Sequence, residues 1–154
     1  MSRSKCTLLL VLAVALLAGC GGSSDSAGES VAEATIAATP DALAGRTFIS
    51  TSMTGRDLAP DSQISLEFTA DTLGFRAGCN SNLGKYQVRK GNLKFFPGPS
   101  TLMACPDELM AQDDWLRTFL EEGVDASLGE DQLRLSGNDD VVIELEESVG
   151  LPGS

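Results

Sequence analysis

Apolar and polar residues alternate in short segments along most of this sequence, and that alternation limits the available folds more than any other feature. In the segment 63–69, Ile64, Leu66 and Phe68 fall on one face of an extended chain, as in a strand with one side buried. Gly, Asn and Asp separate such segments about every ten residues, a spacing typical of antiparallel hairpins. We expect strands at 47–53, 63–69, 72–77, 85–89, 93–96, 124–128, 132–135 and 141–145.

One segment follows a helical period instead. Pro106 suits a first helical position and Gly123 is placed to end a helix, so we expect the helix between them. Its apolar residues recur three or four positions apart, and its charged residues are expected to face solvent. The apolar set is Leu109, Met110, Trp115, Leu116, Phe119 and Leu120, and the charged set is Asp113, Asp114, Arg117, Glu121 and Glu122.

These elements predict one α+β domain over residues 41–147. A single helix cannot cover both faces of about eight strands, so the antiparallel sheet must curl into a barrel or a split sandwich. The helix would then pack on this barrel-like sheet or plug one end of it.

The first twenty residues have the parts of a bacterial export signal. Arg3 and Lys5 supply positive charge, the apolar run 8–18 is too short to span a bilayer, and Leu17-Ala-Gly-Cys20 resembles a lipobox. We expect residues 1–19 to be removed as a signal peptide and Cys20 to carry diacylglyceryl and acyl chains such as palmitate. An ordinary signal peptide that ends near a Cys is the alternative.

Lipidation of Cys20 would hold the mature protein on a membrane without spanning it. Residues 20–40 are rich in Gly, Ser, Ala, Thr and Glu and are expected to form a flexible tether. Gly21 lacks the Asp of an inner-membrane retention signal. We therefore expect a cell-envelope location, at the outer membrane (periplasmic face or surface) in a Gram-negative source. Residues 148–154 are expected to form a disordered tail.

Charge narrows the choice of partners. The chain carries 22 acidic and 11 basic residues, and loss of Arg3 and Lys5 would take its formal charge from −11 to −13. This charge disfavours nucleic acid and would attract a cationic protein. The sequence contains no His, so the commonest general base and the commonest metal ligand are missing. We expect a monomer without a metal or other cofactor.

Two cysteines remain after export, because Cys6 leaves with the signal and Cys20 is used for lipid. An even pair in an oxidising compartment predicts a disulfide between Cys79 and Cys105. A reactive thiol pair is the alternative, although the sequence lacks His and the C-x-x-C spacing that would activate one.

Catalytic and metal-binding motifs are lacking in the sequence. There is no G-x-S-x-G nucleophile motif, and the acidic groups at 113–114 and 138–140 lack the spacing of a calcium loop. These two groups are expected to be a solvated helix face and a hairpin turn. Trp115, Phe119 and Leu120 could line a ligand pocket, but their helical spacing favours the core. We predict no catalytic residue.

Part of the sequence resembles the META domain, or HslJ-like, family. The central block is Gly74–Tyr86, with Gly78-Cys-Asn80 at its core, followed by Gly84 and an aromatic residue, Tyr86. Gly78 and Gly84 could permit unusual backbone angles or close packing, and Asn80 could cap backbone groups. A loop constrained in this way could hold a binding site, although a purely structural role for these residues is favoured.

Further blocks extend the resemblance over nearly all of 41–147. Residues 101–105 are similar to a second block that leads into a helix, and 133–135 with 142–145 are similar to a closing hairpin. Phe48 stands where the family often has Trp. The resemblance implies a compact α+β domain with a barrel-like antiparallel sheet, no established enzymatic activity, and an association with heat shock, stress and antibiotic tolerance.

The leading hypothesis is a non-enzymatic envelope lipoprotein with a stress-response or binding role. One alternative is a lipid-anchored inhibitor of a basic hydrolase such as lysozyme, which the negative charge would attract. Another is a pilotin-like assembly factor for an outer-membrane component, which would need an exposed apolar groove between helix and sheet.

Overall fold

The computed structural model describes residues 35–148. The expected signal peptide, Cys20 and the tether as far as residue 34 lie outside the described residues, as do residues 149–154. The described elements are β1 (Ile36–Ala37), α1 (Pro40–Leu43), β2 (Thr47–Thr54), β3 (Ser65–Phe68), β4 (Thr72–Arg76), β5 (Ser81–Arg89), β6 (Asn92–Ser100), α2 (Asp107–Glu122), β7 (Val124–Leu128), β8 (Gln132–Ser136), a 3-10 turn (Asn138–Asp140) and β9 (Val142–Glu147).

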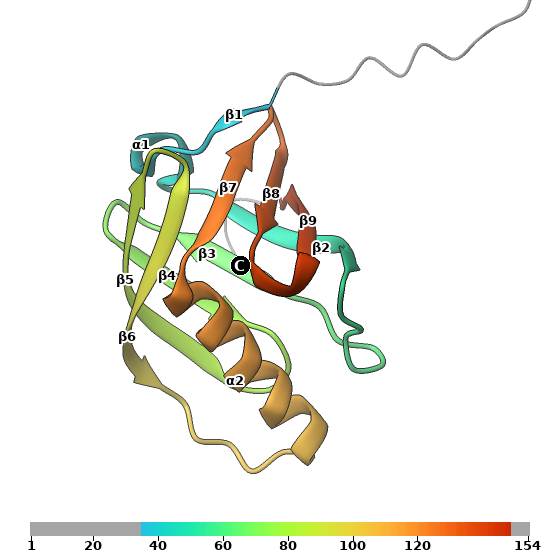
Figure 1. The fold of residues 1–154 in the computed structure, drawn as a ribbon. Helices are drawn as coiled ribbons and strands as arrows, with labels where there is room; N and C mark the ends of the chain where they lie inside the picture. Colours follow the sequence, from blue (N-terminus) through green and yellow to red (C-terminus); the bar gives the residue numbers. More distant parts are fainter. Residues whose placement is uncertain (1–34, 149–154) are drawn as a thin grey trace, which may run out of the picture. The chain divides into compact units, whose positions relative to one another are not determined.

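Strands β2–β9 form a closed antiparallel barrel (Figure 1). Each of these strands pairs with the next one along the chain, and β9 returns to pair with β2. β1 is an extra strand. β6 pairs only with the first two residues of β7, and β1 pairs with the last two residues of β7. The expected α+β fold with a barrel-like antiparallel sheet and one main helix is confirmed.

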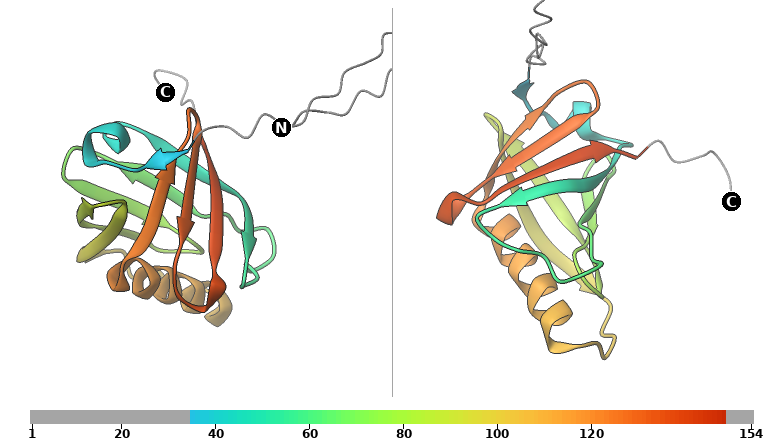
Figure 2. Two further views of the ribbon diagram at one scale, coloured as in Figure 1. Left: turned by 45° about the horizontal axis from the view of Figure 1, so that its top comes forward. Right: turned by 90° about the vertical axis from the view of Figure 1, so that its right-hand side faces the viewer.

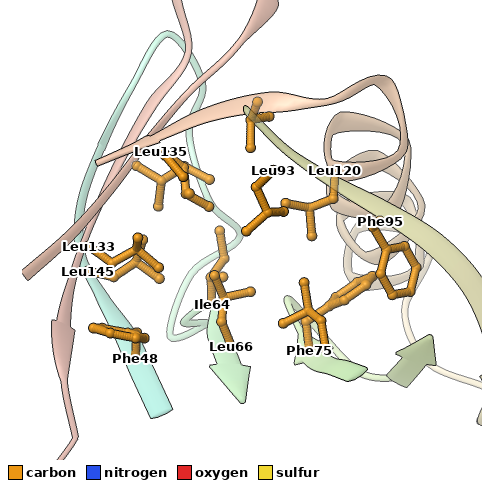
Figure 3. Close-up of a cluster of buried hydrophobic side chains, with 14 of the residues drawn as sticks. Phe48, Ile64, Leu66, Phe75, Leu93, Phe95, Leu120, Leu133, Leu135 and Leu145 are labelled. Atoms are coloured by element: carbon orange, nitrogen blue, oxygen red, sulfur yellow. The ribbon is translucent and has the colours of Figure 1, made fainter. Parts of the chain in front are cut away.

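The interior of the barrel is filled by apolar side chains that alternate along the strands (Figure 3). Phe48 from β2, Leu66 from β3 and Leu133 from β8 are fully buried, and every strand from β2 to β9 contributes at least one buried apolar side chain. Aromatic rings meet edge to face inside, with the centroids of Phe75 and Phe95 5.1 Å apart. Burial of this apolar surface is the main force that closes the barrel.

Helix α2 lies across one end of the barrel (Figure 2). β6 and β7 pair only through Asn92–Leu93 and Val124–Asp125, so the barrel opens between them beyond that point and α2 covers the opening. Leu116, Phe119 and Leu120 of α2 enter the core, as their helical spacing predicts. Gly123 ends the helix with a φ of +96°. Within residues 35–148, no helix has the length and apolar character needed to cross a membrane.

Three segments differ from the sequence-based assignment. β5 begins at Ser81, so four of the seven residues of the expected loop 78–84 are in a strand that pairs with both β4 and β6. β6 continues past the expected strand 93–96 to Ser100, because its last residues pair with this early part of β5. Residues 36–40, which the composition assigns to the tether, are part of the fold. Ile36 and Ala37 pair with the edge of β7 that β6 leaves free, and Thr39 caps α1 through a bond from the Ala42 N–H.

Candidate binding site at the helix end of the barrel

Asp113 organises the polar contacts at this end of the barrel. Its side chain lies in α2, is 5% exposed, and accepts hydrogen bonds from four successive backbone N–H groups. Oδ1 accepts from Ala77 (3.2 Å) and Gly78 (2.8 Å), and Oδ2 accepts from Cys79 (3.0 Å) and Asn80 (2.7 Å). We call these four residues the motif loop. The prediction that Asp113 faces solvent is wrong, because the four donors replace the water that the carboxylate loses on burial.

The sequence does carry a signal for this role. Asp113 follows Leu109 by four positions and precedes Leu116 by three, so it lies on the apolar stripe of the helix. An acidic residue on a buried stripe must find partners, and here they come from a loop more than thirty residues earlier in the chain.

Gly78 allows α2 to approach the motif loop closely. A Cβ added at this position would lie 2.5 Å from the carbonyl oxygen of Leu109 in the first turn of the helix. A Cβ at Gly84 would likewise overlap the ring of Phe95 and the backbone of Phe96. Neither glycine has a positive φ, so both are required for close packing rather than for unusual backbone angles.

Asn80 connects the motif loop to residues 101–105, which we call the 101–105 loop. Its Oδ1 accepts hydrogen bonds from the Thr101 hydroxyl (3.0 Å) and from the backbone N–H of Met103 (2.8 Å). Cys79 and Cys105 make a second connection, since their sulfur atoms lie at disulfide distance and their Cα atoms are 6.5 Å apart. The 101–105 loop is therefore held at both ends.

Gln112, the neighbour of Asp113, is a second polar residue that the sequence analysis missed. It is 3% exposed, and its Oε1 accepts from the N–H of Ala59 (2.6 Å). Its Nε2 donates to the hydroxyl of Ser62 (2.9 Å) and to the carbonyl of Ala77. Gln112 thus joins the loop after β2 to the motif loop, and both contacts are too distant in sequence for a local pattern to reveal.

A cleft of about 510 Å³ lies between the 101–105 loop, the adjoining ends of β5 and β6, and α2. Leu102, Met103 and Met110 contribute apolar surface. Asn82 contributes a side chain that is 7% exposed, and its Nδ2 has no hydrogen-bond partner among the described residues. Arg117 also lines the cleft and pairs with Asp114 at 2.8 Å. The cleft thus offers mainly apolar contacts with a few polar groups, a combination typical of binding sites.

Exposed apolar side chains gather around this cleft. Of the five large apolar residues that the described chain exposes, Leu83, Leu102 and Met103 line this cleft. Phe96 lies opposite Lys85 on the outer face of the β5–β6 hairpin, and Ile36 is in β1. Leu102 is 96% exposed and Met103 is 58% exposed. We call the three residues that line the cleft the apolar patch: Leu83, Leu102 and Met103.

Tyr86, like Gly78 and Gly84 and unlike Asn80, does not line the cleft. Its ring is buried beside Phe68, with centroids 5.3 Å apart, and its hydroxyl donates to the carbonyl of Thr69 at 3.0 Å. Burial raises the pKa of Tyr86, and the nearby carboxylates of Asp41 and Asp71 raise it further. Tyr86 therefore stabilises the opposite part of the barrel.

The arrangement favours binding over chemistry. The Asp113 carboxylate already accepts four hydrogen bonds, which leaves it poorly placed to take a proton from a substrate. Trp115 stacks on Phe119 with ring centroids 5.4 Å apart and is covered by the Arg56 guanidinium. Among residues 35–148, no three Cys, Asp or Glu side chains are grouped closely enough to hold a metal ion.

Comparison with known proteins agrees with this architecture. A family model described as the META domain matches residues 41–149. The NMR structure of a protein from Burkholderia xenovorans is similar, with 17% identity, a TM-score of 0.55, and coverage of 71% of this chain and 86% of that chain. A second NMR structure of a protein has 19% identity, a TM-score of 0.53, and coverage of 71% and 94%. No curated protein matches the sequence. At these identities the two structures show the fold alone.

Proposed function

This chain belongs to the META domain family, and we propose that it is a non-enzymatic, lipid-anchored binding protein of the cell envelope. Its partner would be another envelope protein that inserts an apolar segment into the cleft beside the 101–105 loop. The proposal combines the lipobox ending in Cys20 with the apolar patch. A role in stress tolerance would be the physiological result of such binding.

The observation that carries the proposal is the position of the apolar patch. The 101–105 loop and α2 lie at one end of the barrel, and β1, where the described chain begins, lies at the other end (Figures 1 and 2). If residues before Thr35 lead to a lipid on Cys20, the patch would point away from the membrane. Exposed apolar clusters on a soluble domain usually mark an interaction site.

The filled barrel also favours a partner at the surface. Phe48, Leu66, Leu133 and their neighbours occupy the space in which a lipocalin-like barrel would hold a ligand. An apolar groove between helix and sheet is also what an assembly factor of the pilotin kind needs, so we place the proposed role in that class. The mature protein would be a monomer without cofactor, at the outer membrane in a Gram-negative source.

The test has two parts. Mass spectrometry of the purified native protein should find a chain that begins at an acylated Cys20, and an intact Met1 would contradict the proposal. A photo-reactive amino acid at Leu102 should then cross-link one reproducible envelope protein in cells, whereas the same group at the exposed Asp139 should not. With that protein purified, Leu102→Ser should weaken binding at least tenfold. Equal cross-linking from both positions would refute the proposed site.

A second candidate, inhibition of a basic hydrolase, is supported by the acidic side of α2. Asp107, Glu108, Asp114 and Glu122 all lie on this helix and are not buried. Such a face would attract a cationic protein in a salt-dependent manner. Binding to lysozyme that is present at low salt and weaker at moderate salt, together with inhibition, would favour this candidate. No binding at either salt would remove it.

A further inference from the structure

The cations of this acidic domain are concentrated on one hairpin. Residues 35–148 contain 19 acidic and 9 basic residues, and four of the nine are on the hairpin of β5 and β6. Lysine is even more restricted, because the only lysines after the expected cleavage site are on this hairpin. We call the four residues the cationic hairpin: Lys85, Arg89, Lys90 and Lys94.

These side chains share the outer face of the hairpin or its turn. Gln87 lies opposite Lys94 and Arg89 lies opposite Asn92 in the β5–β6 register, and the residues between them point into the barrel. Lys85, two positions before Gln87, belongs to the same outward set, and its side chain is 76% exposed. Lys90 is exposed in the turn that joins the strands.

Most of the cationic hairpin is not neutralised by the domain itself. Among the described residues, Arg89, Lys90 and Lys94 form no ion pair, although acidic side chains outnumber basic ones two to one. Lys85 has an exposed pair with Asp71 at 3.7 Å, which contributes little. Asp125 lies opposite Asn92 in the β6–β7 register and accepts a hydrogen bond from the Asn92 side chain at 3.4 Å. The hairpin therefore offers uncompensated positive charge to a partner.

The turn of this hairpin lies at the end of the barrel where the described chain begins. The carbonyl of Gly91 accepts a hydrogen bond from Ala126, and the carbonyl of Ala126 accepts one from Ala38. β1 is thus next to the turn, as Figure 1 shows, and it carries the exposed side chain of Ile36. Fourteen residues separate Cys20 from Thr35, so an acyl anchor on Cys20 would keep this end close to the bilayer.

We infer that the cationic hairpin docks on anionic lipid head groups of the membrane that carries the anchor. The inference rests on the proposed lipid anchoring, since so few cations on an acidic domain bind a membrane only weakly when free in solution. The anchor raises the local lipid concentration, which makes the weak contact effective. Docking would orient the barrel with its turn toward the lipid and its apolar patch toward the partner.

Lysine reactivity tests the inference directly, because the mature chain has lysines only on this hairpin. The lipidated protein is inserted in vesicles of phosphatidylcholine, either pure or with phosphatidylglycerol as about a third of the lipid. Lysine acylation by a water-soluble reagent is then followed by mass spectrometry. Arg117→Lys in α2 adds a reference lysine at the opposite end of the barrel. Modification of Lys85, Lys90 and Lys94 should slow at least threefold in the anionic vesicles relative to this reference lysine, and high salt should abolish the difference.

A charge-matched pair of variants separates docking from net charge. Arg89→Gln with Lys94→Gln should remove the slowing at the remaining hairpin lysines, whereas Arg56→Gln with Arg76→Gln, at two exposed positions outside the hairpin, should leave it in place. Equal lysine reactivity in the two kinds of vesicle would overturn the inference. The intact mass of the same preparation reports whether Cys20 is acylated, so failure of the anchor and failure of the docking face remain distinguishable.

Discussion

The motif-loop end of the barrel and the sheet of β7, β8 and β9 are stabilised by different kinds of contact. In the sheet, Leu133, Leu135 and Leu145 alternate with exposed residues and pack into one core. At the motif loop, one carboxylate satisfies four backbone N–H groups, and Gln112 satisfies three further polar groups. The sheet tolerates exchange of one apolar residue for another, whereas the polar end depends on individual atoms.

This difference explains how a small acidic domain can expose apolar residues in a fixed arrangement. The 101–105 loop has no regular secondary structure, yet Asn80 and the Cys79–Cys105 pair connect it to the motif loop. Asp113 and Gly78 in turn connect the motif loop to α2. A binding surface that is ordered before its partner arrives loses less entropy on binding.

The largest effect is expected from Asp113→Asn. An amide has one acceptor oxygen, and its NH₂ group would oppose two of the four N–H donors, so the free energy of unfolding should fall by about 3–5 kcal/mol. Urea denaturation measures the change. Asp114→Asn is the matched control, because that side chain is 73% exposed and its loss should cost less than about 0.5 kcal/mol. Similar losses in both variants would contradict the role given to Asp113.

Removal of the cross-link should follow in size. The cysteines are 26 positions apart, so Cys79→Ala with Cys105→Ala should lower the free energy of unfolding by about 3 kcal/mol if the pair is oxidised. The same denaturation experiment with and without reductant checks this. A wild-type protein whose stability is unchanged by reductant would show that the thiols are not paired.

A smaller loss is expected when a methyl group is added at the motif loop. Gly78→Ala should destabilise by about 1–3 kcal/mol, because its Cβ would meet the carbonyl oxygen of Leu109 at 2.5 Å. Gly74→Ala provides the control in the neighbouring strand, where the nearest atom to an added Cβ is 3.8 Å away. Thermal unfolding of the two variants should therefore differ, and equal midpoints would mean that the close approach of α2 is unimportant.

The smallest effect concerns the other end of the barrel and depends on pH. The pKa of Tyr86 is raised in the folded state. The resulting contribution to the free energy of unfolding is fully present below the unfolded-state pKa of about 10, and it is lost as the pH rises from there through the folded-state pKa. Tyr86→Phe should lower the free energy of unfolding by about 1 kcal/mol at pH 8, because the hydrogen bond to the Thr69 carbonyl is lost. The variant should also lose less stability than the wild type as the pH rises above 10. Parallel stability curves for the two proteins would contradict this assignment.

How far the sequence predicts the structure differs between the same two regions. Alternation placed β2–β4 and β7–β9 nearly correctly, because a barrel strand buries every second residue and the period is visible locally. It missed the start of β5, where Ser81 and Asn82 are polar but paired on both sides. Asp113 and Gln112 were missed because their partners lie in other parts of the chain. The sequence singles out the glycines and Asn80 of the motif, yet it could not say what they contact.

Amide hydrogen exchange of residues 77–80 tests the central claim most directly. If the Asp113 carboxylate holds the motif loop, these four amides should be as protected as those of β8 and β9, although they lie in a loop. In Asp113→Asn their protection should drop at least a hundredfold more than that of Leu133 and Leu145. Exchange of the wild-type amides at the rate of an exposed turn such as 138–140 would contradict the account.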